Sequence, residues 1–404
     1  MRTKIGRRQQ PTGKRKDNTY LSLSRSRFAY WSVALLFLIS LPYTLSPTPL
    51  NASSPGTVAG QFLKTDISPR ALGMGGSFVA VADGIYNVTY NPAGMGQLYL
   101  PEVSAMHLSG FSDTKTQFVA IGAPLPFLGL SGIGKPGIAF SALFESDGDF
   151  VFRSIDPNNG SIYTKKMEAE KNTVLSLSYG EKVFDEDVNI EGYNAAITQY
   201  MGLSVKYLKS RLLDTYSAAS FLFDAGYLIT ETNIGLSLGA SISNMGGKLK
   251  YVSKEESLPT ILRLGASYFK PTLKDQTLLF SLEGDIYTNE KLKALKFGLE
   301  YHFQKVFNLR MGYKAMTENN GLTMGVGFFH EGIELDFGMS VSNDVFNTSQ
   351  ISLTYKFRNF KGYKPAKKRE YYAPQKKRKP KKPRKKRVDP RKKKSKDSDF
   401  FWIY

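Results

Sequence analysis

An alternation of apolar and polar residues with a period of two recurs along most of this chain. In residues 333–341 the odd-numbered positions are Ile, Leu, Phe, Met and Val, and the even-numbered ones are Glu, Asp, Gly and Ser. Successive side chains of a β-strand point to opposite faces, so such a segment has one apolar and one polar face. About fourteen segments show this pattern, near residues 103–111, 115–124, 137–146, 172–181, 199–209, 218–229, 232–244, 261–270, 276–287, 293–304, 307–316, 322–330, 333–343 and 349–358.

The length of these segments separates two all-β architectures. Most have nine to thirteen residues, whereas strands of soluble proteins average about five or six and a tilted transmembrane strand needs about 9–11. A soluble β-sandwich would also alternate, but interfacial aromatic girdles are expected only of membrane barrels. Aromatic residues lie near several segment ends: Tyr207, Tyr227, Tyr268, Tyr287, Phe303, Tyr355 and Phe357. We therefore predict an all-β fold, an antiparallel transmembrane β-barrel of about 14 strands over residues 101–358.

In such a barrel the apolar faces contact outer-membrane lipid and the polar faces line the lumen. The candidate lumen residues carry charges of both signs: Arg263, Glu283, Asp285, Lys296, Glu300, His302, Arg310, Lys314, Glu334, Asp336 and Lys356. Charges on neighbouring strands can pair across the wall, which favours a structural network. A hydrated, selective pathway is the alternative.

A glycine-rich stretch, residues 72–96, precedes the alternating segments and fits neither a strand nor a long helix. It contains six glycines and ends in Asn-Pro-Ala-Gly, a combination that marks fixed turns. A nucleotide-binding loop is disfavoured because no Lys-Ser/Thr pair follows the glycines. The lumen of a 14-stranded barrel is too wide for wall side chains to fill. We therefore expect residues 53–100 to form a hatch inside the barrel.

Both ends of the chain are basic, and the body between them is mildly acidic. Residues 1–30 carry a net charge of +8, and eleven apolar or small residues follow at 31–41. This pattern is typical of a secretory signal, for which we expect cleavage after Ala52; an anchored N-terminus is the alternative. Residues 359–404 are rich in Lys and Arg and lack the apolar content to fold.

The basic tail should lie in the periplasm, because an even number of strands places both barrel termini at one end. An anionic envelope polymer or an acidic protein is then a better partner for it than nucleic acid, and a merely solvated tail remains open. The chain has no cysteine, and its three histidines, His107, His302 and His330, show no metal-ligand spacing. We expect no metal, no cofactor and no enzymatic activity.

Three stretches resemble the FadL-like outer-membrane superfamily, and within it the PorV/PorQ branch. They are ISPRALGMGGSFVAVADGIYNVTYNPAGMG at residues 67–96, LSLGASISNMGGKLKY at 236–251 and LPTILRLGASY at 258–268. The resemblance implies a 14-stranded barrel whose N-terminal hatch gates a path for hydrophobic molecules, which leave through a gap in the wall. The positions that match the hatch signature are Leu72, Gly73, Met74, Gly75, Gly76, Asp83, Asn91, Pro92, Ala93 and Gly94.

The matched residues are expected to hold the shape of the hatch, with Asp83 capping a turn or pairing with a lumen Arg or Lys. Pro136 and Gly137 mark a place where the wall could be distorted, since proline removes a ladder donor. The expected function is a channel of the bacterial outer membrane for hydrophobic or amphipathic, fatty-acid-like small molecules. The alternative is a PorV-like component of protein secretion or envelope assembly that uses the basic tail as a docking arm.

Overall fold

The computed structural model describes residues 58–358, apart from 111–112, 156, 158–159, 191–192, 274, 291, 318–319 and 343–346. The signal peptide, the basic N-terminal region and the basic tail that the sequence predicts lie outside the described residues. Within the described part, no helix combines the length and the apolar composition needed to cross a membrane.

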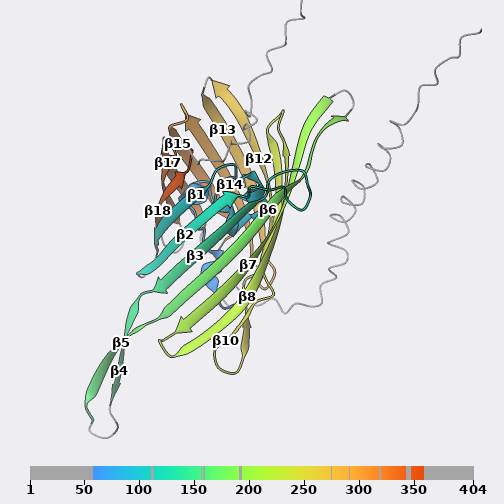
Figure 1. The fold of residues 1–404 in the computed structure, drawn as a ribbon. Helices are drawn as coiled ribbons and strands as arrows, with labels where there is room; N and C mark the ends of the chain where they lie inside the picture. Colours follow the sequence, from blue (N-terminus) through green and yellow to red (C-terminus); the bar gives the residue numbers. More distant parts are fainter. Residues whose placement is uncertain are drawn as a thin grey trace, which may run out of the picture. The chain divides into compact units, whose positions relative to one another are not determined.

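Fourteen strands close into a single barrel in which every strand is antiparallel to its neighbours (Figure 1). The first strand pairs with the last, Glu102 lying opposite Lys356 and Ser109 opposite Ser349. The strands are β1 (Glu102–Ser109), β2 (Thr114–Pro124), β3 (Gly137–Asp147), β6 (Glu170–Ile190), β7 (Tyr193–Leu212), β8 (Tyr216–Glu231), β9 (Leu236–Met245), β12 (Ile261–Leu273), β13 (Gln276–Tyr287), β14 (Leu292–Phe303), β15 (Phe307–Ala315), β16 (Gly321–His330), β17 (Ile333–Ser342) and β18 (Thr348–Lys356). The fold class predicted from the alternation is confirmed.

Two small ribbons project from one end of the barrel, which we call the ribbon end. They are β4 (Asp149–Ile155) with β5 (Ile162–Glu168), and β10 (Lys248–Lys250) with β11 (Glu255–Ser257). The opposite end, where β1 begins and β18 finishes, is the terminal end. The sequence pattern did not predict these ribbons, nor that β6 and β7 would have 21 and 20 residues.

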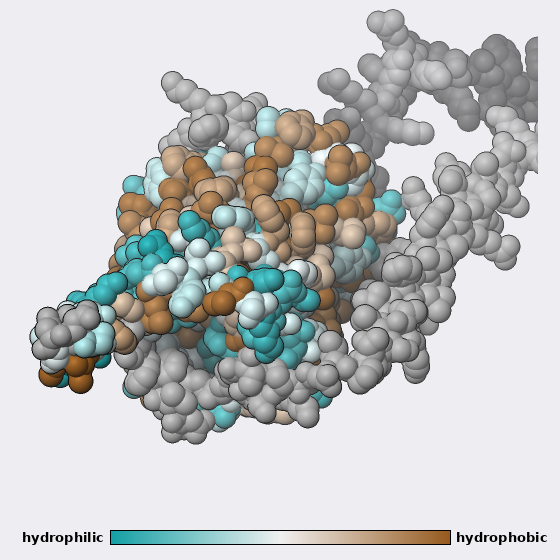
Figure 2. Space-filling model, turned by 90° about the horizontal axis from the view of Figure 1, so that it is seen from below, coloured by the Kyte–Doolittle hydropathy of each residue, from teal (hydrophilic) through white to brown (hydrophobic). Residues whose placement is uncertain are grey.

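The outer face of the wall is apolar. On β15, Leu309 is 56% exposed and Met311 51%, whereas Arg310 between them is 4% exposed. In Figure 2 hydrophobic residues gather over the flank of the barrel, and hydrophilic ones gather around the end that faces the viewer. This distribution is that of an outer-membrane barrel.

Two local predictions were wrong. Tyr287 is 7% exposed and packs inside the barrel against Ile261, so it belongs to no outer aromatic girdle. The register stays unbroken at Gly137, which pairs with both Pro124 and Gly180. Register shifts lie instead between Lys182 and Phe184, Phe223 and Ala225, and Pro271 and Leu273.

Residues 58–100 fold inside the barrel, and we call this segment the plug. It contains η1 (Gln61–Lys64), α2 (Pro69–Gly73), α3 (Asn87–Tyr90) and η2 (Pro92–Gln97). Ser68 caps α2 by accepting a hydrogen bond from the Ala71 amide, and the following proline suits the first helical position. Gly75 and Gly76, at φ of +67° and +76°, turn the chain after α2. The plug is therefore a series of short turns and not a regular element.

Candidate functional site

A belt of inward-facing glycines joins the wall to the plug. At each of them an added Cβ would lie within 3.2 Å of a plug atom. They occur on eleven of the fourteen barrel strands: Gly122, Gly137, Gly180, Gly202, Gly226, Gly239, Gly265, Gly298, Gly312, Gly325 and Gly338. We call this set the glycine belt. Since these wall positions carry no side chain, wall and plug approach each other closely along the glycine belt.

The strand register places several glycines of the belt directly opposite one another. Gly180 is paired with Gly137 on one side and with Gly202 on the other, and Gly202 is paired in turn with Gly226. Farther round the barrel, Gly298 lies opposite Gly312. Close contacts between plug and wall on eleven of the fourteen strands thus involve residues that are far apart in sequence.

Polar wall side chains bind the plug backbone next to the glycine belt. Glu283 accepts hydrogen bonds from the amides of Phe78 and Val79, both at 2.7 Å. Ser241 donates to the Tyr90 carbonyl at 2.7 Å, and Thr323 accepts from the Gly75 amide at 2.8 Å. The backbone of the plug, which also has hydrogen bonds within its own turns, thus obtains further partners from the barrel.

The residues of the hatch signature serve three structural purposes. Leu72 and Met74 are buried against the wall, and Gly73, Gly75 and Gly76 allow close approach. Asn91 accepts a hydrogen bond from the Ala93 amide and donates to the Val79 carbonyl at 2.8 Å and to the Tyr227 carbonyl at 3.2 Å.

The end of the signature is held just as tightly. Pro92 begins η2, and an added Cβ at Gly94 would lie 2.5 Å from the Ala82 carbonyl oxygen. Asp83 pairs with Arg70, a residue of the plug itself and not of the wall.

The predicted lumen charges form separate networks on the inner wall. Toward the terminal end, Arg70 of α2 donates to both oxygens of Glu300 at 2.8 and 2.7 Å. Arg310 bridges Glu300 at 2.6 Å and Asp336 at 2.5 Å, and His302 lies 2.7 Å from Glu300. Here the network fastens α2 to the wall.

The pair of Glu334 with Lys356, at 2.8 Å, lies on the neighbouring strands β17 and β18. It joins two wall strands to each other, in contrast to the network around Glu300.

A second network lies on the ribbon-end side of the glycine belt. Lys296 pairs with Asp285 at 2.7 Å and Glu283 at 3.5 Å, and the Arg263 Nε lies 3.9 Å from each of these carboxylates.

The same side of the belt carries one more ion pair between plug and wall. Lys314 donates to Asp66 of the plug. Burial alone would raise the pKa of the Asp66 carboxyl, but the charges of Lys314 and Lys296 outweigh it and lower this pKa to about 2. Asp66 is therefore charged at neutral pH and ties the plug to β15.

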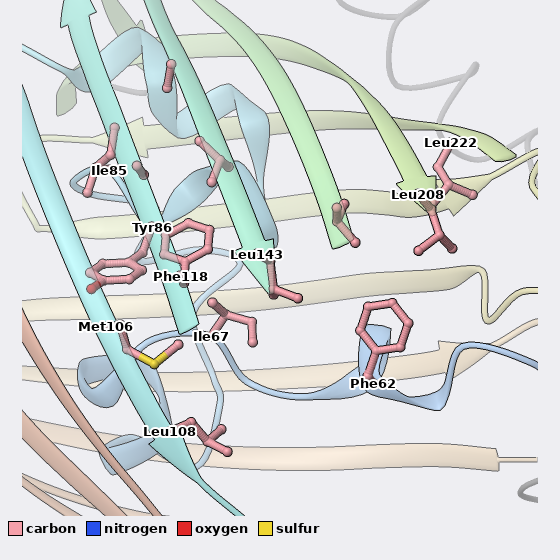
Figure 3. Packing of buried hydrophobic residues seen from close by; sticks show 14 of the residues in the cluster. Phe62, Ile67, Ile85, Tyr86, Met106, Leu108, Phe118, Leu143, Leu208 and Leu222 are labelled. Atoms are coloured by element: carbon pink, nitrogen blue, oxygen red, sulfur yellow. The ribbon is translucent and has the colours of Figure 1, made fainter. Parts of the chain in front are cut away.

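The ribbon-end half of the lumen is apolar on the side of β1 to β8 (Figure 3). Side chains from six wall strands point inward and meet Phe62, Ile67 and Ile85 of the plug. The wall contributes Met106, Leu108, Phe118, Ala120, Ala139, Leu143, Val174, Leu208, Ala218 and Leu222, and Leu249 and Leu258 add to it from β10 and the segment after β11. We call this set the apolar lumen cluster.

The sequence analysis missed the apolar lumen cluster because it assigned every inward face to polar residues. A signal was present in short runs where both faces are apolar, such as Ala142-Leu143-Phe144 and Phe221-Leu222-Phe223. The first and third residues of each run face outward, and the middle one is buried inside. A strand buried on both faces reads as a continuous apolar run.

The start of the plug covers the apolar lumen cluster at the ribbon end. The Ala59 amide donates to the Ser257 carbonyl of β11 at 3.1 Å. Lys64 and Gln61 both donate to Glu290, at 3.0 Å each, and Phe62 inserts among the cluster side chains. The cluster is thus enclosed by wall, ribbon and plug together.

A hollow of about 520 Å³ lies on the outer surface of β12 to β16. Outward side chains line it, among them Tyr268, Phe280, Phe297 and Met311. On the inner side of the same wall, Met74 and Gly75 contact Gly298 and Gly312. The ladders from β12 to β16 continue beneath the hollow, so it is a depression in the lipid-facing surface and no opening into the lumen.

Comparison with known proteins finds similarity in structure but not in sequence. No family model matches the chain, and neither does any curated protein. Among solved structures, the toluene transporter TbuX of Ralstonia pickettii is 13% identical, covers 72% of this chain and 98% of its own, and gives a TM-score of 0.47.

Two further solved structures give similar values. The toluene transporter TodX of Pseudomonas putida is 11% identical with a TM-score of 0.44, covering 72% of this chain and 96% of its own. A FadL homologue of Pseudomonas aeruginosa is 11% identical with a TM-score of 0.45, covering 72% and 98%. Since all identities are below 25%, the compound that each of those proteins transports is a property of that protein alone.

Proposed function

We propose that this protein is an outer-membrane channel that takes small hydrophobic molecules into the apolar lumen cluster and passes them onward when the plug rearranges. The observation that carries this proposal is the cluster itself. Wall side chains that face a hydrated pore are polar, yet here Phe118, Leu143, Leu208 and Leu222 face inward and are buried. An apolar surface enclosed in a barrel lumen suits an apolar ligand.

The paired charges favour a ligand without a carboxylate. In the described part of the lumen on the ribbon-end side, each wall cation has a carboxylate partner: Lys206 pairs with Asp224 at 2.5 Å, and Arg263, Lys296 and Lys314 are paired as above. A fatty-acid anion would have to displace one of these partners and leave it buried without a counter-charge, which is costly. Neutral molecules meet no such penalty.

The orientation follows from the connections. Outer-membrane barrels have short turns in the periplasm and longer loops outside the cell. The connections at the ribbon end include both ribbons, so we place the ribbon end outside and the terminal end in the periplasm. Ligands would then enter near Phe62 and β10–β11 and meet the apolar lumen cluster before the glycine belt.

The test is binding of octanol to the full chain in lipid nanodiscs, measured by calorimetry against empty nanodiscs. Leu222→Asn places an amide in the apolar lumen cluster and should weaken octanol binding at least about tenfold, since burying an unpaired amide costs roughly 1–3 kcal/mol. Leu213→Asn, in the adjacent β7–β8 turn, is the matched control. Its φ of 53° suits asparagine, so binding should stay unchanged. Equal effects of the two variants, or no binding by the parent chain, would contradict the proposal.

A further inference from the structure

Two carboxyl groups, one buried and one partly buried, lie at the ribbon-end edge of the apolar lumen cluster. Glu145 on β3 is paired in register with Asn172 on β6, and the next inward pair is Leu143 with Val174, both members of the cluster. Glu170, two residues before Asn172, faces the same side of β6. Glu145 and Asn172 are 7% and 1% exposed. Polar groups and apolar cluster therefore form one continuous surface.

The side-chain amide of Asn172 bridges the two carboxyl groups, and Glu170 also accepts a hydrogen bond from the Ser210 hydroxyl at 3.4 Å. The Asn172 Nδ2 donates to Glu145 at 2.8 Å and to Glu170 at 2.9 Å. The amide oxygen, Asn172 Oδ1, is buried and has no hydrogen-bond partner among the described residues. A buried acceptor without a donor calls for an explanation, and a bound donor is one of them.

The two carboxylates also differ from the other buried acids in having no counter-charge. Within the described residues, neither Glu145 nor Glu170 makes an ion pair. Lys171, the nearest lysine in sequence, pairs with Glu168 instead. A cation placed between the two carboxyl groups would stabilise their ionised forms, because no ion pair within the described residues already offsets them.

We propose that Glu145, Glu170 and Asn172 bind the ammonium group of an amphipathic amine whose apolar tail lies in the apolar lumen cluster. The ammonium has three donors and no acceptor, and it meets two carboxylates and the free amide oxygen. Leu143 and Val174, one step deeper, receive the first carbons of the tail. This inference rests on the proposed function and narrows its ligand class to molecules with a cationic head.

The experiment compares octylamine, octanol and octanoate, which share one tail, at pH 7.5 on the full chain in nanodiscs, with empty nanodiscs subtracted. Octylamine should bind at least about tenfold more tightly than octanol, since a hydrogen bond to a charged group contributes roughly 1.5–3 kcal/mol. Octanoate should bind more weakly than octanol. Glu145→Gln should bring octylamine down to the affinity of octanol and leave octanol unchanged, which also shows that the variant has folded.

Glu255→Gln is the matched control, because Glu255 lies on β11 near the same end of the barrel but is exposed and paired with Lys248. It should leave the order of the three affinities intact. Equal binding of octylamine and octanol overturns the inference while the proposed function stands. Failure of all three to bind above empty nanodiscs refutes both.

Discussion

The glycine belt makes a sharp prediction about Gly312. A Cβ at this position would lie 2.1 Å from the Gly75 nitrogen, whereas ordinary contacts begin near 3.4 Å. Gly312→Ala therefore requires the plug to withdraw by about 1.3 Å at this point. The hydrogen bond from Gly75 to Thr323, now 2.8 Å long, would be lost. Overpacking costs roughly 1–3 kcal/mol and the lost bond about 1 kcal/mol, so docking of the plug should weaken by about 2–4 kcal/mol.

The absence of cysteine in the chain makes the assay direct. A single reporter, Ala80→Cys, lies on the plug, where residue 80 is buried beside Ser267. Its labelling by a water-soluble maleimide measures how often the plug leaves the wall. With Gly312→Ala added, labelling should accelerate about 30-fold or more, as 2 kcal/mol implies, and ion conductance in planar bilayers should rise.

Gly284→Ala is the control for this prediction. Gly284 also lies on a barrel strand, but its nearest neighbour for a Cβ is 4.0 Å away. Labelling and conductance should then match those of the reporter chain alone. If Gly312→Ala and Gly284→Ala gave the same labelling rate, the belt would not be what seats the plug.

Three further predictions concern the other contacts of the plug. Arg70→Ala leaves Glu300 with fewer partners and should weaken docking of the plug by about 2–3 kcal/mol, which raises the labelling rate of the same reporter. Loss of the exposed Lys248 should change the labelling rate little. Because the pKa of Asp66 is lowered to about 2, Asp66 contributes about 2 kcal/mol to docking of the plug above about pH 4. This contribution is lost as the pH falls toward 2. Labelling of the reporter by an acid-tolerant thiol reagent should therefore stay constant from pH 8 to 5 and rise below pH 4. Leu258→Ala should cost about 2–4 kcal/mol of local stability and speed limited proteolysis within residues 246–260, since this side chain is fully buried under the ribbon.

The barrel could be predicted from sequence because the requirement for alternating apolar and polar residues applies within each strand separately. Each strand has to present an apolar face to lipid, so alternation alone located all fourteen strands to within a few residues, apart from the long extensions of β6 and β7. These extensions and the two ribbons leave the membrane, where no lipid imposes the pattern. The sequence of these segments is typical of loops, and whether they form strands depends on the segment with which they pair.

The site could be predicted only in part. Charged residues such as Glu283, Lys296 and Arg310 were expected in the lumen, and the structure places them on the inner wall, but their partners come from distant strands and from the plug. Glu145 and Asn172 offered no signal, because each is an ordinary polar residue within an alternating segment. What distinguishes Glu145 is that, among the residues that the structure describes, no cation pairs with it, and only the closed barrel reveals this.

The plug is held differently on its two sides, which leads to a prediction about the side on which it would open. Helix α2 packs on β15 to β18 and is fastened there by buried ion pairs through Arg70. Helix η2 packs on β3 and β6 to β8, where it meets Gly180, Gly202 and Gly226 without any charged contact from its own residues. Moving α2 would leave buried charges uncompensated, whereas moving η2 gives up chiefly van der Waals contact and the hydrogen bonds of Asn91.

The side with the weaker attachment is also the side with the apolar lumen cluster. On β7 the inward face runs from Leu208 in the cluster to Gly202 in the glycine belt, and on β8 it runs from Leu222 to Gly226. If the proposed function is correct, a ligand that leaves the cluster along β6 to β8 has to displace η2. We therefore expect η2 to move first, while the ion pairs of α2 keep the rest of the plug in the barrel.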